Sequence, residues 1–436
     1  MKTIHAAAAG VRAGKATPLD LVDMCLENID RHETKVRAWV FVERHYARAE
    51  AKRLTEELGK GQDRGPLHGI PIAVKDIFDV FDWPTAAGSH LWEKSIARQD
   101  CEVVRRLRAA GAIFLGKTVT TQYASFDPPV TRNPWKLDRT PGGSSSGSAA
   151  ALATGMCLGA LGSQTGGSLT RPASYCGVAA CKPTYGSVPL EGIVPLAWSM
   201  DHPGPMARCV QDLGLMLAVL ADSWRDSIRE GPVPPQLTRV YGLFQDMAEP
   251  SVRESMEEIT SKLQAAGALL DAAALPAGFA DVVERHRMVM AVEAAQFHKV
   301  RLERHPDDYK PNIRKLLEEG LACSAAAYAD TKAHQHRLRE QTQAMLADGT
   351  ILLTPAATSP APDAATTGNP AFNSPWSYTG LPTVSLPTRQ FVDGMPLAIQ
   401  LVGGRGSESR LLEVGQWCER ALGVEPLVPS QIQFKG

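Results

Sequence analysis

Apolar positions recur at helical spacing in several parts of the chain. Thr17-Pro18 followed by Asp20 predicts a helix start, because threonine caps free amide groups, proline suits the first turn and an acid faces the positive end of the helix dipole. Apolar residues at steps of three and four then continue from Leu19 to Ile29. Similar periodicity predicts helices at 42–58, 102–110, 252–266, 279–303, 328–346 and 408–422.

Short apolar runs between these helices predict buried strands. The clearest runs are 70–74, 112–115 and 397–402, and their alternation with helices favours an α/β layer with a largely buried sheet. By contrast, 210–347 is predicted to be helical and polar. The segment 355–375 is rich in proline, alanine and threonine and is predicted to run over the surface without regular structure.

Composition narrows the class of protein. The 436 residues include 46 basic and 47 acidic side chains, a net charge of −1, which argues against binding to nucleic acid. The eight cysteines are scattered without a C-x-x-C pair, so we expect free thiols rather than disulfides or metal ligands. With neither an apolar leader nor an apolar run of about 18 residues, the chain is expected to be cytoplasmic and not bound to membranes.

Glycine and serine are concentrated at 141–147, which reads Pro-Gly-Gly-Ser-Ser-Ser-Gly, and three interpretations compete. A flexible linker is disfavoured because helix-forming residues follow at once at 149–152. A phosphate-binding loop would need the lysine of the Walker motif, which is missing. A G-x-S-x-G nucleophile elbow with Ser145 at its centre would need a preceding apolar strand, which is also missing.

A second glycine-rich segment, 162–172, contains Gln-Thr-Gly-Gly-Ser. Glycines before a serine allow successive backbone N–H groups to point at one spot, as in an oxyanion hole. Such a serine needs a base, and His68 and His202 are the nearby histidines. A buried lysine can also act as the base, and Lys75 follows the predicted strand 70–74. These residues favour a hydrolase that uses serine and lysine.

The segments 68–76, 141–147 and 162–172 together resemble the amidase signature family in order and spacing. Further segments that fit its pattern are 84–89, 133–134, 192–212, 380–382 and 396–401. The resemblance implies an α/β fold in which a mixed central β-sheet of about eleven strands is sandwiched between α-helices. It implies one domain, 1–436, composed of N-terminal helices (1–60), a catalytic core (65–210), a helical substrate-side segment (210–350) and a C-terminal return to the sheet (350–436).

Carried over residue by residue, the resemblance implies a catalytic triad of Ser168, Ser144 and Lys75 that needs no metal or organic cofactor. Ser168 is the expected nucleophile, and Lys75 is the expected base, which receives the proton through Ser144. The peptide bond before Ser144 is expected to be cis. The backbone N–H groups expected to hold the oxyanion are those of Thr165, Gly166, Gly167 and Ser168.

The second segment departs from the family's commonest pattern. Most members carry Asp at the position of Gln164 and Arg at that of Thr170, whereas here the arginine is Arg171. The same change resembles a subset that includes malonamidase and carboxybiuret hydrolase. Two interpretations of Arg171 stay open: it binds a substrate carboxylate, for which a planar guanidinium is suited, or it anchors the protein backbone.

Further residues are candidates for contact with substrate. Gln164 is one, and Gln122 and Tyr123 are expected at the rim of the active site. Aromatic residues expected to line an acyl pocket are Phe126, Trp135, Tyr175 and Trp376. A packed core position is the alternative for each aromatic residue.

These features predict an amidohydrolase that cleaves a linear C–N amide bond of a small molecule through an acyl-enzyme. A carbamate or ester hydrolase with the same triad is the first alternative. An amidase-like component of a transamidase-type complex is the second. For the quaternary structure, base rates favour a homodimer.

Overall fold

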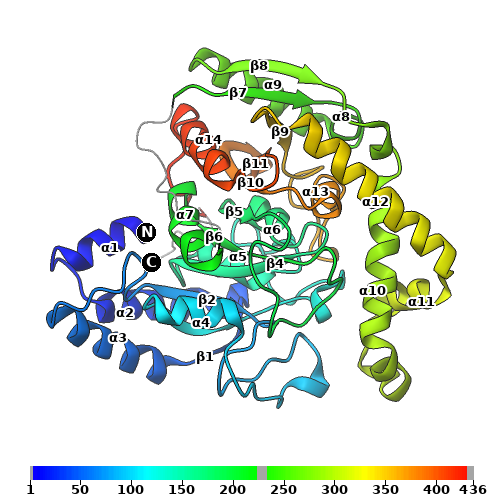
Figure 1. Cartoon of the computed structure of the whole chain (residues 1–436). Helices are drawn as coiled ribbons and strands as arrows, with labels where there is room; N and C mark the ends of the chain where they lie inside the picture. The colour runs from blue at the N-terminus through cyan, green and yellow to red at the C-terminus, as the bar shows by residue number, and fades with distance from the viewer. Residues whose placement is uncertain (1–2, 223–232, 430–436) are drawn as a thin grey trace.

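The computed structural model describes residues 3–222 and 233–429. Eleven strands in these ranges form one mixed sheet in the order β1-β3-β2-β4-β6-β5-β10-β11-β9-β7-β8 (Figure 1). Its strands are β1 (Trp39–Val42), β2 (Pro71–Lys75), β3 (Ile113–Thr118), β4 (Gly159–Gln164), β5 (Ala179–Lys182), β6 (His202–Ala207), β7 (Gln236–Val240), β8 (Leu269–Ala273), β9 (Ile351–Pro355), β10 (Thr383–Val392) and β11 (Met395–Val402). The predicted α/β fold with a mixed sheet is confirmed.

Helices flank this sheet, and their ends follow local sequence signals. In α2, the hydroxyl of Thr17 accepts from the N–H of Asp20, and the Asp20 carboxylate accepts from the N–H of Thr17, so the predicted helix start is confirmed. The α-helices of the described ranges are α1 (Ile4–Arg12), α2 (Pro18–Val36), α3 (Arg44–Gly59), α4 (Glu102–Ala109), α5 (Ser146–Ala153), α6 (Thr170–Cys176), α7 (Val210–Leu220), α8 (Leu243–Asp246), α9 (Pro250–Ala265), α10 (Val282–Arg304), α11 (Pro311–Ala322), α12 (Ala325–Met345), α13 (Ser374–Thr379) and α14 (Glu408–Ala421). Short 3-10 helices are η1 (His90–Trp92), η2 (Gln122–Ala124), η3 (Ala277–Phe279) and η4 (Pro306–Asp308). Within these ranges no helix combines the length and apolar character needed to cross a bilayer.

Two glycines of β4 identify the helices on each face of the sheet. Gly159 and Gly162 are three residues apart and therefore face opposite sides. A Cβ at Gly159 would lie against Ile4 of α1 and Met216 of α7. A Cβ at Gly162 would lie against Ser145 and Leu169, the residues that precede α5 and α6. Helices α1 and α7 thus cover one face of β4, and the starts of α5 and α6 cover the other.

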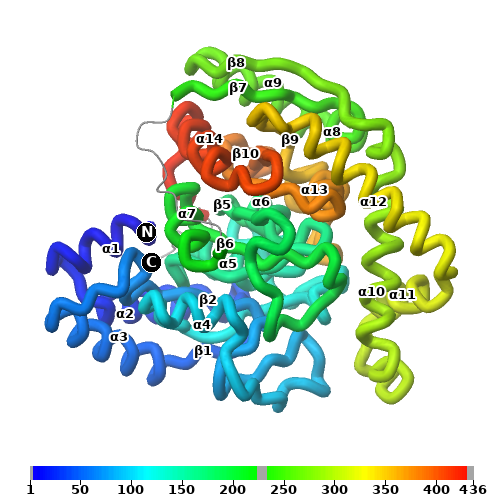
Figure 2. Tube along the Cα trace, viewed as in Figure 1, coloured from blue at the N-terminus to red at the C-terminus, as the bar shows by residue number. Residues whose placement is uncertain are grey.

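The prediction of helix throughout 210–347 is wrong at two places, because β7 and β8 lie in that range. Strand β7 pairs in parallel with β8 and β9, and β8 forms the edge of the sheet. The five residues of β8, Leu-Leu-Asp-Ala-Ala, are too few to show periodicity, and alanine favours helices in isolation. Helices α10, α11 and α12 do follow, stacked along one side of the molecule next to α13, as Figure 2 shows.

Strands β2 and β4 run parallel to each other, with Val74 opposite Leu161. The carboxyl ends of parallel neighbours meet at the same edge of a sheet. Lys75, the last residue of β2, and Gln164, the last residue of β4, therefore lie at one edge. The second glycine-rich segment leaves β4 at this edge, and Ser144 of the first segment bonds there to Lys75.

Gly147 lies where α5 approaches other backbone most closely. A Cβ at this position would stand 2.1 Å from the carbonyl oxygen of Ala38 and 2.5 Å from the amide nitrogen of Val119. We predict that Gly147→Ala lowers the free energy of unfolding by about 2 kcal/mol, because backbone atoms cannot move aside as a flexible side chain can. Urea unfolding measures the change. The control is Gly10→Ala in α1, where a Cβ meets nothing within 4 Å and should be neutral or stabilising; equal effects of both variants would contradict the prediction.

Candidate active site

Lys75 is fully buried at the end of β2 and has hydroxyl partners instead of a carboxylate. Its Nζ donates to the Oγ of Ser144 at 2.7 Å and to the Oγ of Ser163 at 2.8 Å. Burial lowers the pKa of Lys75 to about 7, and the negative charge of Asp201 opposes this shift in part. Near pH 7, Lys75 is therefore a neutral amine in a large fraction of the protein molecules, and in that form it can accept a proton.

The carboxylate next to Lys75 in sequence is neutralised by a different lysine. Asp76 accepts from the Nζ of Lys117 at 2.9 Å, and this ion pair is buried. The Lys117 ammonium also donates to the carbonyl of Pro84 and the hydroxyl of Thr85, both at 3.1 Å. The second oxygen of Asp76 is buried without a partner, and in the described ranges no carboxylate forms an ion pair with Lys75.

The first glycine-rich segment turns sharply into α5. The peptide bond between Gly143 and Ser144 is cis, and Gly142 has φ +82°. The N–H of Ser145 donates to the carbonyl of Ser168 at 3.1 Å, which holds the two glycine-rich segments side by side. The hydroxyl of Ser145 faces the carbonyl of Ser163 at 3.3 Å, and the residues before it form a loop, so the elbow interpretation finds no support here.

In the second glycine-rich segment, the backbone N–H groups of residues 165–168 have no hydrogen-bond acceptor in the described ranges. Each carbonyl of residues 165–168 accepts a hydrogen bond within the protein, while their four N–H groups donate to no atom of the described residues. The donors to these carbonyls are His286 Nε2 to Thr165 (2.8 Å), Ser377 Oγ to Gly166 (3.1 Å), the N–H of Arg171 to Gly167 (3.0 Å) and the N–H of Ser145 to Ser168 (3.1 Å). Successive free N–H groups beside a serine are suited to binding an anionic oxygen.

The histidines considered as bases lie elsewhere. The Nδ1 of His202 faces the carbonyls of Met200 (2.6 Å) and Gln164 (3.2 Å), and burial holds the pKa of His202 well below its usual range. The Nε2 of His68 lies 2.8 Å from the carbonyl of Leu54. Neither ring bonds to a serine of the glycine-rich segments, whereas Lys75 bonds to one serine of each segment.

Gln164 is buried with every polar atom of its side chain engaged. Its Oε1 accepts from the N–H groups of Leu169 (3.1 Å) and Thr170 (3.0 Å), and its Nε2 donates to the hydroxyl of Ser377 at 3.2 Å. These bonds hold the turn that carries Ser168. A substrate contact of Gln164 stays a prediction, since its amide already serves the loop.

Arg171 is buried behind the first segment. Its Nη2 donates to the carbonyl of Gly143 at 2.8 Å and lies 3.4 Å from the hydroxyl of Thr367, while Nε and Nη1 are buried without a partner. In the described ranges no carboxylate forms an ion pair with this guanidinium, and burial lowers the pKa of Arg171 to about 10. One turn along α6, Tyr175 packs in a small apolar cluster with Trp135. Arg171 thus has an anchoring bond and two donor nitrogens without a partner in the described ranges.

Gln122 and Tyr123 of η2 connect the segment after β3 to the segment before α11. The Tyr123 hydroxyl donates to the Asp308 carboxylate at 2.7 Å, and the Oε1 of Gln122 accepts from the N–H of Lys310 at 2.7 Å. Tyr123 also packs against His298, with ring centroids 4.4 Å apart. These contacts match the packed alternative for Tyr123, and contact with substrate stays a prediction for both residues.

Sequence reasoning missed Ser163, Asp201, His286 and Ser377. Ser163 lies on β4, and its link to Lys75 would have followed had β4 been assigned as a strand parallel to β2. Asp201 is buried and accepts from the hydroxyl of Thr165 and from the N–H groups of Leu196 and Ala197. No local pattern signals His286 or Ser377, because each meets the loop only through the tertiary fold.

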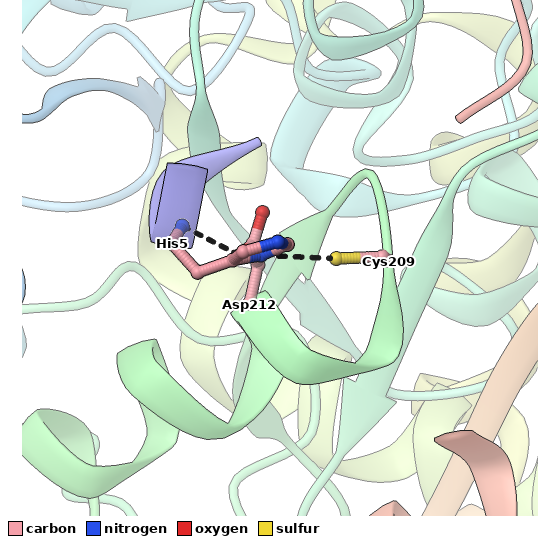
Figure 3. Close-up of side chains that lie close together, drawn as sticks. All are labelled: His5, Cys209 and Asp212. Carbon is pink, nitrogen blue, oxygen red and sulfur yellow. Dashed lines mark hydrogen bonds and ion pairs between the residues drawn. The ribbon is translucent and has the colours of Figure 1, made fainter. Parts of the chain in front are cut away.

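One cluster in the described ranges has side chains spaced like metal ligands: His5, Cys209 and Asp212 (Figure 3). The carboxylate of Asp212 is already occupied. Its Oδ2 accepts from the N–H of Ile4 at 2.6 Å, and its Oδ1 accepts from the N–H and the Nδ1 of His5 at 2.9 and 2.8 Å. Asp212 therefore caps α1 and links it to α7, a structural role that needs no cation.

A cavity of about 780 Å³ lies apart from the catalytic candidates, between 241–247 and 272–280. Phe279 in its wall packs on Trp376, with ring centroids 5.5 Å apart. Lys75, Ser144 and Ser168 take no part in its lining, so the site is defined by hydrogen bonding rather than by this cavity.

The mixed sheet and the buried serine–lysine arrangement are typical of a hydrolytic enzyme with an α/β fold, and comparisons identify the family. The family model for amidases matches residues 20–412. An amidase of Pseudomonas putida is 34% identical and aligns over 96% of both chains. A glutamyl-tRNA(Gln) amidotransferase subunit of Synechococcus sp. (strain WH7803) is 32% identical and aligns over 97% of this chain and 98% of its own.

A solved structure, described as a vestigial protein complex that reveals the origins of an s-triazine catabolic enzyme, has the same fold. It superimposes with a TM-score of 0.90 at 29% identity and covers 98% of this chain and 100% of its own. The chain belongs to the amidase family of hydrolases acting on amides, as its resemblance predicted.

The lowered pKa of Lys75 makes stability depend on pH. Between about 7 and the ordinary lysine value of 10.5, the unfolded chain holds a proton that the native protein lacks, so stability rises with pH across this window. We predict that Lys75→Met is more stable than the wild type at pH 6 and that the difference shrinks as pH approaches 10. Denaturant unfolding at several pH values measures this, with the exposed Lys52→Met as control; a difference independent of pH would contradict the prediction.

Proposed function

We propose that the protein is an amidohydrolase that cleaves a linear C–N amide bond through an acyl-enzyme, with Ser168 as nucleophile, Ser144 as proton bridge and Lys75 as base. The observation that carries this proposal is the buried amine of Lys75, which donates to Ser144 at 2.7 Å and has a pKa lowered to about 7. The bond between the N–H of Ser145 and the carbonyl of Ser168 supports it, since it keeps both serines in one region.

Exposure distinguishes the two serines. Ser168 is 8% exposed, and its hydroxyl has no hydrogen-bond partner in the described ranges, whereas Ser144 and Lys75 are 0% exposed. A nucleophile must meet a substrate that arrives from solvent, while a proton bridge works best when shielded from water. Ser168 is therefore the better nucleophile and Ser144 the better bridge.

The reaction proceeds in two halves. Ser168 attacks the carbonyl carbon, and its proton passes through Ser144 to neutral Lys75. The N–H groups of 165–168 stabilise the charge on the carbonyl oxygen. Lys75 returns the proton through Ser144 to the leaving amine as the C–N bond breaks, which leaves an ester on Ser168. Water then attacks this ester by the same proton route and releases the acid.

Two alternatives use the same groups. Carbamates and esters would follow identical steps because only the leaving group differs. A component of a transamidase would release ammonia from glutamine, and the relative from Synechococcus belongs to an amidotransferase. A hydrolysis screen across aliphatic amides, anilides, carbamates, p-nitrophenyl esters and glutamine separates these functions.

We predict that Ser168→Ala and Lys75→Met each lower kcat on the best substrate by at least ~10³-fold, the scale seen when one member of a catalytic unit is removed. The wild-type rate should rise through pH about 7 as Lys75 loses its proton. Lys182→Met is the matched control, because Lys182 is also buried with a pKa lowered to about 7 and bonds to the carbonyl of Leu381. A folded Ser168→Ala variant with wild-type activity would exclude the proposed nucleophile.

We further propose that the substrate carries a carboxylate held by Arg171. A buried guanidinium without an acidic partner is costly, and an anionic ligand would offset that cost while engaging the free Nε and Nη1. The bond to the Gly143 carbonyl adds an anchoring role next to Ser144. The anchoring interpretation is thus supported by a contact and the carboxylate interpretation by two donor nitrogens without a partner, and measurements of activity distinguish them.

Arg171→Met should lower kcat/KM about 10- to 100-fold for an anionic amide such as malonamate, the scale of a lost charge-assisted hydrogen bond. For acetoacetamide, a neutral amide of the same shape, the change should stay within about threefold. Steady-state ammonia release measures both, and thermal unfolding checks the fold. Equal losses on both amides would assign Arg171 to anchoring alone.

A further inference from the structure

Helix α10, which lies outside the glycine-rich segments, places one side chain on the loop that carries the free amides. The Nε2 of His286 lies 2.8 Å from the carbonyl oxygen of Thr165, and the ring is 3% exposed. Burial lowers the pKa of His286 to about 4, so the imidazole is neutral at pH 7. A carbonyl can only accept, so the ring proton must sit on Nε2, which donates to Thr165.

The bond from His286 to the carbonyl of Thr165 also orients the N–H of Gly166. The C=O of Thr165 and the N–H of Gly166 belong to one planar trans peptide and point in opposite directions. Fixing the carbonyl against His286 therefore turns the N–H of Gly166 away from α10. In the same way, Ser377 fixes the N–H of Gly167, and the N–H of Arg171 fixes that of Ser168.

The same helix also reaches the other side of Thr165. Glu293, seven residues after His286 and therefore on the same face of α10, accepts from the N–H of Ser199 at 2.9 Å and from its hydroxyl at 2.6 Å. Ser199 lies two residues before Asp201, which accepts from the hydroxyl of Thr165. Helix α10 thus holds the carbonyl of Thr165 directly and its hydroxyl through the loop of Asp201.

We propose, on the basis of the function proposed above, that His286 is a positioning residue for the reaction: its Nε2–H holds the carbonyl of Thr165 so that the N–H of Gly166 faces the developing oxyanion. His286 touches no reacting atom. Its effect is on the transition state, because the amide that it orients meets charge only after the nucleophile has attacked. The helical segment 282–304 is therefore part of the catalytic apparatus through this one bond.

The test compares His286→Leu with His286→Gln. Leucine removes the donor, whereas the amide nitrogen of glutamine reaches the place of Nε2. We expect His286→Leu to lower kcat about 10- to 100-fold with KM within about threefold, and His286→Gln to recover most of the loss. The affinity for n-butylboronic acid, which forms a tetrahedral anion on a serine, should fall with kcat in the leucine variant, as calorimetry would show.

His298 provides a matched control on the same helix. It is buried, its pKa is lowered to about 3 by burial, and its Nδ1 bonds to the hydroxyl of Tyr309 away from the loop. His298→Leu should therefore leave kcat and boronate affinity within about threefold of the wild type. If His298→Leu lowered kcat and boronate affinity as much as His286→Leu does, a general loss of packing would explain both results, and the positioning role would be overturned.

The outcomes distinguish a failure of the role proposed for His286 from a failure of the proposed function. Activity that persists in Ser168→Ala overturns the proposed function itself. An inactive Ser168→Ala together with a His286→Leu variant of unchanged kcat and boronate affinity overturns only the role of His286. If His286→Leu does not fold, His286→Gln is compared with His286→Asn, whose amide is too short to reach Thr165. A higher kcat for the glutamine variant supports the proposal, and equal values overturn it.

Discussion

The burial of Lys75 without a counter-charge is the constraint on which the site depends. Two buried lysines, Lys75 and Lys117, lie on the neighbouring strands β2 and β3, and the carboxylate that follows β2, Asp76, pairs with Lys117. Lys117 also donates to two oxygen acceptors, whereas the partners of Lys75 in the described ranges are the hydroxyls of Ser144 and Ser163. Desolvation then favours the neutral amine. Both serines must converge on one strand end, which brings the first glycine-rich segment and β4 together.

The site also depends on a run of backbone N–H groups that have no hydrogen-bond partner among the described residues. The loop 165–168 supplies this run by using all its carbonyls, so that its N–H groups are the ones left free. The donors come from α10, α13 and the starts of α5 and α6, which are far apart in sequence. Helix α5 can pass this close because it is built of small residues, and at Gly147 the backbone of Ala38 and Val119 leaves no room for a Cβ. Packing and chemistry are therefore set by the same contacts.

Much of the fold was predictable where the signals are local. The cap at Thr17 places the start of α2, and apolar periodicity places α9, α12 and α14 within a few residues, because such signals act over one or two turns. Strands β7 and β8 were missed, since five-residue strands gain their stability from pairing with strands that lie outside the local sequence window, here β8 with β7 and β7 with β9. The contacts of Gln164 and Tyr123 could not be predicted from the sequence either. Gln164 bonds to Ser377 in α13, and Tyr123 bonds to Asp308 before α11.

The sequence by itself determined the family, through the order and spacing of Lys75, Ser144 and Ser168 and the glycines around them. It also determined which residues could carry a proton or turn the backbone. Only the tertiary structure decided which lysine goes without a carboxylate, which hydroxyls it meets and which helix holds the amide loop. The physical reason is that desolvation and hydrogen-bond partnership belong to a place in space, and this place is built from segments between Lys75 and Ser377.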